Sequence, residues 1–244
     1  MTVKAPIKQA MLELKDVSLS YHSNKTTFEH GLHRVLDGVS LELQEGETLG
    51  IIGKNGCGKT TILRIMAGIL APSAGSVRQR PGVSSALLTI GLGFNFQLSG
   101  RDNALLSSRL QGLSQQQAES YLEDIKDFSE LGDSFEEPVK TYSAGMKARL
   151  GFTTALLTHV DIMLIDEVLS VGDAHFRKKA EAALKERIEG KQTVVFVSHS
   201  EQQIHALCDR AMWLHEGRVA AHGDTSDVLS LYNDYIQSID ENKH

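Results

Sequence analysis

The residues best suited to chemistry lie in the glycine-rich segment Gly53–Thr61. Its spacing fits G-x-x-x-x-G-K-[ST], the pattern of a phosphate-binding loop. Glycines let the backbone turn sharply and direct its N–H groups at phosphate oxygens. Lys59 is expected to reach the β- and γ-phosphates, and the Thr60 hydroxyl is expected to ligate Mg²⁺. The loop residues expected to hold the phosphates are Gly53, Lys54, Asn55, Gly56, Cys57, Gly58, Lys59, Thr60 and Thr61.

The elements on either side of this loop suit such a role. Residues Thr48–Ile52 form a short apolar run, as expected of a buried parallel strand. Residues Thr61–Ala67 carry apolar side chains at helical spacing, so a helix N-terminus would face the same anion. This strand–loop–helix setting favours phosphate binding over the alternative of a glycine-rich turn without a ligand.

Two acidic residues follow a second apolar run, Ile162–Ile165. Downstream of a phosphate-binding loop, this arrangement is the Walker B pattern. Asp166 can hold Mg²⁺ through its water shell, and Glu167 is placed to polarise the water that attacks the γ-phosphate. The alternative is an ordinary strand end with solvated acids.

A histidine follows a third apolar run, Val194–Val197. His199 would lie at the carboxyl end of that strand, which faces the ligand crevice of an α/β sheet. Its imidazole could hydrogen-bond the γ-phosphate and sense hydrolysis. The alternative is a structural histidine.

The composition is that of an ordinary globular protein. The chain has 244 residues, of which 41% are hydrophobic and 23% charged, and its net charge of −6 gives no hint of general nucleic-acid affinity. No apolar run approaches the roughly 18 residues that cross a bilayer, and the segment 1–10 lacks the apolar core of a secretory signal. Cys57 and Cys208 lie far apart, which favours a reduced, cytoplasmic compartment.

The N-terminal third has the alternation of β-strands. Met11–Tyr21 reads as a strand with a bulge near Lys15-Asp16, and Val39–Leu43 and Ser76–Arg78 read as further strands. The segment His22–His33 between the first two is polar and contains three histidines. We interpret it as a loop rather than a metal site, because no cysteine or acidic cluster completes a ligand set.

A helical block interrupts the α/β pattern from about Ser99 to residue 158. Ser114 could cap a helix that runs from Gln115 to Phe128, and a second helix is expected over Met146–Leu157. The elements expected after this block are a helix over Ala174–Ile188, a strand over Thr193–Val197, a helix over Glu201–Cys208, a hairpin of Ala211–His215 and Arg218–Ala221, and a last helix capped by Asp224 or Thr225 that ends near Ser238.

The segment Tyr142–Lys147 resembles the signature of ABC ATPases, usually L-S-G-G-Q, with Ala144 in place of its first glycine. A serine and a glycine at a helix start make an anion site. Three stretches are similar to the ATPase subunits that export bacterial polysaccharides, namely O antigens, capsules and teichoic acids. Those stretches are Tyr142–Leu150, Asp166–Phe176 and Gly100–Asn103, and the resemblance extends over residues 11–236.

This resemblance implies a fold of the α/β class. It consists of a P-loop NTPase core with a parallel sheet, an N-terminal antiparallel β subdomain and an inserted α-helical subdomain. We therefore expect one ABC ATPase domain over residues 1–244, with its helical insert at about 99–158. The final amphipathic helix is followed only by the polar stretch 237–244, so we expect no C-terminal carbohydrate-binding domain.

The resemblance also implies further site residues. Tyr21 matches the aromatic residue that stacks on adenine, although it could instead be a core tyrosine at a strand end. Ser143 and Gly145 match the signature residues that face the γ-phosphate of ATP bound to a second copy, and Asp173 matches the acid that lines the dimer interface. Gln97 is a candidate for the glutamine that touches Mg²⁺ and the membrane subunit. An ordinary loop glutamine is the alternative, because Gln97 lies unusually close to Ser99.

The implied function is that of the ATP-hydrolysing subunit of an exporter of lipid-linked polysaccharide. Two copies would enclose two ATP molecules with Mg²⁺ and would drive two integral-membrane subunits from the cytoplasmic face of the bacterial inner membrane. The polysaccharide would be contacted indirectly, and nucleic acid would not be a partner. The loop His22–His33 is a candidate contact for the lipid-linked substrate or for the membrane partner. One alternative is the ATPase of a different transporter, such as a solute importer. Another is a soluble ABC protein that acts on nucleic acid, although such proteins usually carry two ATPase halves or a long coiled coil.

Overall fold

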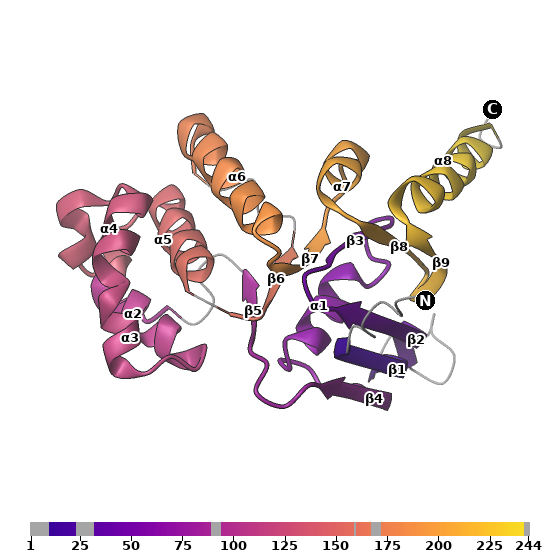
Figure 1. Cartoon of the computed structure of the whole chain (residues 1–244), viewed down its shortest axis with the longest axis horizontal. Helices are drawn as coiled ribbons and strands as arrows, with labels where there is room; N and C mark the ends of the chain where they lie inside the picture. Colours follow the sequence, from indigo (N-terminus) through magenta and orange to yellow (C-terminus); the bar gives the residue numbers. More distant parts are fainter. Residues whose placement is uncertain (1–9, 23–31, 89–93, 159, 167–171, 242–244) are drawn as a thin grey trace, which may run out of the picture. The chain divides into compact units, whose positions relative to one another are not determined.

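The computed structural model describes residues 10–22, 32–88, 94–158, 160–166 and 172–241 (Figure 1). These residues fall into two compact units. Unit 1 comprises Met1–Val83 and Lys191–His244, and unit 2 comprises Ser84–Gly190.

Unit 1 contains an antiparallel sheet with the strand order β2-β1-β4. Its strands are β1 (Ala10–His22), β2 (Leu32–Gln44) and β4 (Ala74–Gln79). The register between β1 and β2 shifts between Leu14 and Val17, and Asp16 in this segment has a φ of 50°. The bulge predicted near Lys15-Asp16 is confirmed, and it explains why the apolar residues of β1 change parity there.

The predicted loop His22–His33 is wrong at both ends. His22 is the last residue of β1 and pairs with Leu32, and Tyr21 pairs with His33. β1 continues one polar residue past Tyr21, and β2 starts at Leu32, whose single apolar side chain among polar neighbours gives no alternation that would reveal a strand. The rest of the loop, residues 23–31, lies outside the described residues, and with it the proposed substrate contact.

A second set of strands in unit 1 has the order β7-β3-β8-β9. These strands are β3 (Thr48–Ile52), β7 (Thr193–Val197), β8 (Arg210–His215) and β9 (Arg218–Asp224). β3 is parallel to both β7 and β8, and every residue of β3 and β7 is buried. Burial on both faces accounts for their continuous apolar sequences. β8 and β9 form the predicted hairpin, in which Glu216 and Gly217 have φ values of 47° and 77°.

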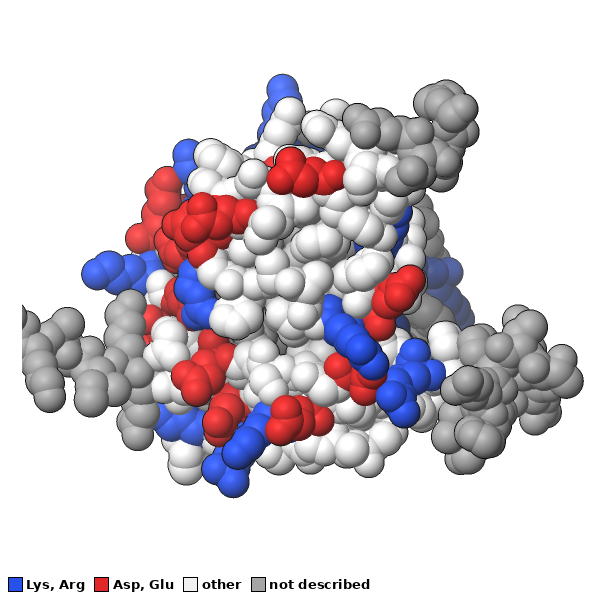
Figure 2. Space-filling view, turned by 90° about the vertical axis from the view of Figure 1, so that its right-hand side faces the viewer, with Lys and Arg blue, Asp and Glu red and all other residues white. Residues whose placement is uncertain are grey.

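The helices of unit 1 are α1 (Lys59–Met66), α7 (Glu201–Leu207) and α8 (Thr225–Glu241). Asp224 caps α8, because its Oδ1 accepts a hydrogen bond from the Ser226 N–H at 2.9 Å. Figure 2 views the molecule from the side on which α8 and β9 lie in Figure 1. Acidic and basic residues are interspersed there around a broad uncharged area, so this face presents no field of a single sign.

Unit 2 pairs two parallel strands and is otherwise helical. Its strands are β5 (Ser85–Leu88) and β6 (Ile162–Asp166). Its helices are α2 (Gly100–Leu110), α3 (Gln115–Ser120), α4 (Leu122–Ser129), α5 (Ala144–Leu157) and α6 (Ala174–Glu189), with 3-10 turns η2 (Gly132–Glu136) and η3 (Val139–Thr141). α5 begins two residues before the predicted start at Met146.

The single helix predicted from Gln115 to Phe128 is wrong, because the chain forms two helices that meet at Tyr121. The predicted cap is confirmed: Ser114 and Gln117 form a capping box at the start of α3. The Ser120 hydroxyl donates to the Gln117 carbonyl at 2.8 Å. At Tyr121 the backbone N–H donates to the Ala118 carbonyl at 3.3 Å, three residues back instead of four, so the regular α-helical pairing is interrupted there.

The helices of unit 2 share one apolar core. Ile125 of α4, Phe135 of η2 and Leu150 of α5 are fully buried in it. Tyr142, at the start of the signature-like segment, belongs to the same core and is only 5% exposed. The signature-like segment is therefore anchored to α2, α4 and η2 through its first residue.

Candidate functional site

In unit 1, the glycine-rich loop leaves the carboxyl end of β3 and enters α1. Gly53, Gly56 and Gly58 have φ values of 158°, 78° and 107°, which disfavour any residue with a side chain. A Cβ atom at Gly53 would lie 2.2 Å from the Leu214 carbonyl oxygen. The pattern of glycines is therefore required both by the backbone conformation and by the packing of β8 against the loop.

The ammonium group of Lys59 lies over this loop. The Lys59 side chain is 7% exposed, and its Nζ donates to the carbonyl oxygens of Gly53 at 2.7 Å and Lys54 at 3.0 Å. An ammonium group has three donors, so a third can be directed at an anion while these two bonds persist. The loop thus holds a buried positive charge above its own backbone.

The start of α1 completes an anion-binding arrangement. Gly58 occupies the N-cap position and supplies no side-chain cap, so the first amide groups of the helix can bind a ligand instead. Thr60 is exposed and Thr61 is half-buried at this end of the helix. Backbone amides, a helix N-terminus and the Lys59 ammonium together fit a phosphate group.

Cys57 has a structural role within the loop. Its thiol is largely buried, and burial raises the pKa of the Cys57 thiol. A Cβ atom at Gly53 would lie only 2.8 Å from its sulfur, which shows that the side chain packs under the loop. Cys57 and Cys208 are both free, and burial raises the pKa of Cys208 to about 12.

His199 lies at the same sheet edge as the loop. β3 and β7 are parallel, with Ile51 beside Val197, and Gly53 and His199 each follow two residues later. The turn that carries His199 is held by Ser198, whose Oγ donates to Gln203 Oε1 at 2.7 Å and accepts from the Ser200 N–H at 3.0 Å. The His199 side chain is exposed at this edge.

Tyr21 stands near the end of β1 and is 45% exposed, so the alternative of a core tyrosine is wrong. Its neighbour on β2 is His33. Two and three residues further along β2, Val35 and Leu36 pack under the loop, with the Val35 carbonyl oxygen 3.0 Å from the position of a Cβ atom at Gly58. β2 therefore connects the exposed ring to the phosphate-binding loop.

In unit 2, Asp166 is the half-buried last residue of β6, whose other residues are buried. Its neighbour Glu167, the predicted base, lies outside the described residues. Gln97 is exposed, and its side chain accepts a bond from Lys140 Nζ at 3.5 Å. Its segment pairs with the turn before the signature-like helix, because the Lys140 N–H donates to the Phe96 carbonyl at 2.9 Å. Both interpretations of Gln97 remain open.

The signature-like segment starts α5. Ser143 caps the helix, since its Oγ accepts a hydrogen bond from the Met146 N–H at 3.2 Å. A Cβ atom at Gly145 would meet only the Ser143 Oγ, at 3.8 Å, so the backbone there is open to approach. An exposed serine and an open glycine at the N-terminus of a 14-residue helix suit an anion.

Asp173 has a role within its own chain that the sequence did not indicate. Its carboxylate caps α6 by accepting bonds from the N–H groups of Phe176 at 2.9 Å and His175 at 3.0 Å. These bonds, that of Phe176 above all, hold the pKa of Asp173 below its usual value. Its side chain is exposed, and its predicted place at a dimer interface stays a prediction.

The segment Gly100–Asn103, to which the sequence assigned no role, organises unit 2. Asn103 is 1% exposed and donates from Nδ2 to the carbonyls of Asn95 (3.0 Å), Leu98 (3.3 Å) and Ser99 (2.8 Å), while its Oδ1 accepts from the Asn95 N–H at 2.8 Å. It therefore shapes the turn that carries Gln97. The burial of Asn103 within a helix is what reveals this role, and the sequence alone did not show that burial.

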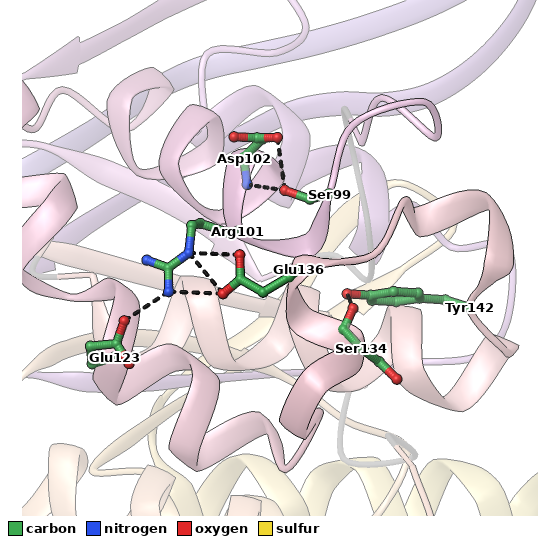
Figure 3. A network of polar contacts seen from close by, with 7 residues as sticks. All are labelled: Ser99, Arg101, Asp102, Glu123, Ser134, Glu136 and Tyr142. Atoms are coloured by element: carbon green, nitrogen blue, oxygen red, sulfur yellow. Dashed lines mark hydrogen bonds and ion pairs between the residues drawn. The ribbon is translucent and has the colours of Figure 1, made fainter.

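Arg101 ties three elements of unit 2 together (Figure 3). Its guanidinium binds both carboxylate oxygens of Glu136, at 2.9 and 3.0 Å, and Glu123 Oε1 at 2.8 Å. Glu136 lies in η2 and Glu123 in α4, so the network joins both to α2. These bonds raise the pKa of Arg101 and lower the pKa of Glu123.

Gly100→Ala should destabilise unit 2. The added Cβ would lie 2.2 Å from the Tyr142 hydroxyl and 2.9 Å from the Phe135 carbonyl oxygen, so α2 would have to shift. We expect a loss of about 1–3 kcal/mol in the free energy of unfolding, measured by urea denaturation. Gly145→Ala is the matched control, because its Cβ enters open space and should not lower stability. Equal stability of Gly100→Ala and the wild type would contradict this account.

The structure thus groups the predicted residues by unit. Unit 1 holds Tyr21, the loop from Gly53 to Thr61, and His199. Unit 2 holds Gln97, Ser143, Gly145, Asp166 and Asp173. Among the described residues, no helix is apolar and long enough to cross a bilayer.

The fold and the loop define a P-loop NTPase. The sequence profile of the family described as "ABC transporter" matches residues 36–170. The structure is similar to the dimeric post-hydrolysis state of an ATP-binding cassette bound to ADP and Pi, with a TM-score of 0.72, 22% identity, and 88% of this chain and 99% of that chain covered. The chain belongs to the ABC transporter family, and the predicted fold class is confirmed.

Two curated relatives are similar over most of the chain. The teichoic acids export ATP-binding protein TagH of Levilactobacillus brevis is 42% identical over 86% of this chain and 59% of its own length. The O-antigen export system ATP-binding protein RfbB of Myxococcus xanthus is 40% identical over 82% of this chain and 46% of its own length. The chain therefore spans less than two thirds of either relative.

Proposed function

We propose that this chain is the ATP-binding and ATP-hydrolysing subunit of an ABC exporter of lipid-linked polysaccharide. The observation that carries the proposal is the phosphate-binding loop, whose glycine conformations and buried Lys59 charge fit a polyphosphate. The relatives are named as ATP-binding proteins for the export of teichoic acids and of O antigen, and these names support the proposal that the exported substrate is a polysaccharide.

The chain's own residues suit ATP with Mg²⁺. The Thr60 hydroxyl, the Asp166 carboxylate and the Gln97 amide are oxygen donors of the kind that Mg²⁺ prefers, and Mg²⁺ would neutralise charge on the phosphates. Among the described residues, no cluster of three or more histidine, cysteine or acidic side chains could hold a metal alone. Mg²⁺ is usually held by one or two carboxylates and by substrate phosphates, which is what the proposal assigns to Asp166 and ATP.

Hydrolysis would depend on residues with distinct tasks. Lys59 and the amides at the start of α1 would hold the phosphates, and Glu167 would take a proton from the attacking water. His199, at the same sheet edge as the loop, would hydrogen-bond the γ-phosphate. Ser143 and Gly145 would bind the same phosphate from a second copy, so that two copies enclose two ATP molecules. The dimeric state of the similar cassette supports this arrangement.

Tyr21→Ala should weaken ATP binding. An exposed aromatic ring that stacks on a base contributes about 1–3 kcal/mol, so we expect the Kd to rise about 5- to 150-fold. Tyr21→Phe keeps the stacking surface and should bind ATP as the wild type does. Calorimetric titration with a non-hydrolysable ATP analogue measures both variants. An unchanged Kd for Tyr21→Ala would show that the Tyr21 ring does not contribute to binding the adenine base.

Such a subunit would lie on the cytoplasmic face of the bacterial inner membrane, held there by its integral-membrane partners. Unit 2 exposes three large apolar side chains that suit a protein contact: Phe96 is 51% exposed, Leu106 39% and Leu110 75%. We propose this set as the contact with two integral-membrane subunits. The polysaccharide would then be contacted indirectly, through those subunits.

Deletion of the gene in its host tests the whole proposal. The deletion should lower surface polysaccharide and leave lipid-linked polymer inside the cell, and the wild-type gene should restore export. A Lys59→Met gene is the matched control, since it supplies the protein without its phosphate-binding charge. Normal surface polysaccharide together with lost uptake of a solute would instead identify an importer. Co-purification with a membrane subunit distinguishes both from a soluble ABC protein.

A further inference from the structure

Four aromatic side chains of β8 and α8 form a cluster in unit 1. The Tyr235 ring lies 5.0 Å from Trp213 and 4.8 Å from His215, measured between centroids, and Tyr232 lies 5.7 Å from Trp213. The Tyr235 hydroxyl is also 3.4 Å from His215 Nε2. The last helix is thereby fixed to β8 by ring contacts as well as by aliphatic packing.

This aromatic cluster borders the phosphate-binding loop. Leu214 lies between Trp213 and His215, and its carbonyl oxygen would be 2.2 Å from a Cβ atom at Gly53. The ammonium of Lys54, the next loop residue, lies 5.2 Å from the centroid of the Tyr235 ring. A cation within about 6 Å of an aromatic centroid is attracted to the ring face. A loop residue is therefore bound by a side chain from the far end of the sequence.

Lys54 links this contact to the buried charge of the loop. Its side chain is exposed and reaches Tyr235, while its carbonyl oxygen accepts the hydrogen bond from Lys59 Nζ at 3.0 Å. Restraining the Lys54 side chain therefore restrains the peptide that orients Lys59. A restrained loop loses less conformational entropy when a ligand binds.

We propose that Tyr235 is a positioning residue of the nucleotide site, which holds Lys54 and thereby prepares the loop for phosphate. The inference rests on the proposed binding of ATP and adds the last helix to the elements that set its affinity. A cation–π contact at an exposed site contributes about 0.5–1 kcal/mol, which corresponds to a change of about 2- to 5-fold in Kd.

A double-mutant cycle tests this role. Calorimetry with a non-hydrolysable ATP analogue gives the Kd of the wild type, Tyr235→Leu, Lys54→Met and the double variant. We expect Tyr235→Leu to raise the Kd about 2- to 5-fold in the wild-type chain and to change nothing in the Lys54→Met chain. Tyr235→Phe keeps the ring and should bind as the wild type does.

Tyr232→Leu is the matched control for packing. It removes a neighbouring ring that contacts Trp213 and leaves the Lys54 contact in place. Its Kd should stay at the wild-type value. Trp213 is the only tryptophan of the chain, so intrinsic fluorescence reports on the cluster directly. Nucleotide should change the emission of the wild type, and Lys54→Met should reduce that change.

Two results would overturn the inference. One is an unchanged Kd for Tyr235→Leu, and the other is an effect of Tyr235→Leu that persists fully in the Lys54→Met chain, which would mean that the ring acts through packing alone. Failure of the proposed function gives a different result, because the wild type would then show no saturable binding of the ATP analogue.

Discussion

Lys59→Met is expected to reduce ATP hydrolysis by about 100-fold or more, the loss typical when a principal donor to the transition state is removed. The Lys59 ammonium is buried and bonded to two loop carbonyls, so its charge is fixed above the loop. Methionine has a similar length and no charge, and it leaves those carbonyls without their donor. Phosphate release from purified protein with ATP and Mg²⁺ measures the effect.

Lys54→Met is the control for this variant. It also removes one positive charge from the loop, but from an exposed side chain that contacts Tyr235 rather than the loop interior. We expect its hydrolysis rate at saturating ATP to stay within about 5-fold of the wild type. Circular dichroism should show both variants folded. A folded Lys59→Met protein that still hydrolyses ATP at half the wild-type rate would show that Lys59 is not required for catalysis.

The elements that position the phosphate-binding loop could be predicted because local and global signals agree there. β3 and β7 are buried on both faces, so their sequences are continuous apolar runs with clear ends. The glycines of the loop need positive φ values, which few other residues tolerate. The strand, the turn and the helix start were therefore all visible in one stretch of sequence.

Other elements depend on contacts that a sequence pattern does not contain. β5 has only four residues and alternates in burial, and it is defined by its pairing with β6. The break at Tyr121 lies within an apolar pattern that continues from Ala118 to Ile125 on one face. The periodicity showed which side is buried and not that the helix is interrupted at Tyr121.

The sequence predicted which residues belong to the candidate site better than it predicted the role of each residue. The residues of the loop and of the strand end at Asp166 were identified from spacing, and those of the signature-like segment from its resemblance to a known family. The capping role of Asp173, the burial of Asn103 and the contact of Lys54 with Tyr235 were not. Each depends on a tertiary or local hydrogen-bonding arrangement, and the Lys54 contact joins residues that are far apart in the sequence.

Glu167→Gln is expected to bind ATP normally and to hydrolyse it about 10²- to 10⁴-fold more slowly, because it removes a general base and leaves the phosphate-binding groups intact. ATP should then accumulate between two copies. The phosphates would join the loop of one copy to Ser143 and Gly145 of the other, since both surfaces offer donors to the same anion. Light scattering should show single chains without nucleotide and the mass of two chains with ATP.

Two second-site variants separate this dimer from unspecific association. Adding Lys59→Met should abolish dimer formation, because ATP is then no longer held. Adding Gly145→Asp should abolish it as well while ATP binding persists, because the new carboxylate would face the partner's phosphates. The open space at Gly145 lets the aspartate fit within its own chain. A stable dimer of Glu167→Gln without ATP, or turnover at the wild-type rate, would show that ATP is not what joins the copies or that Glu167 is not the base.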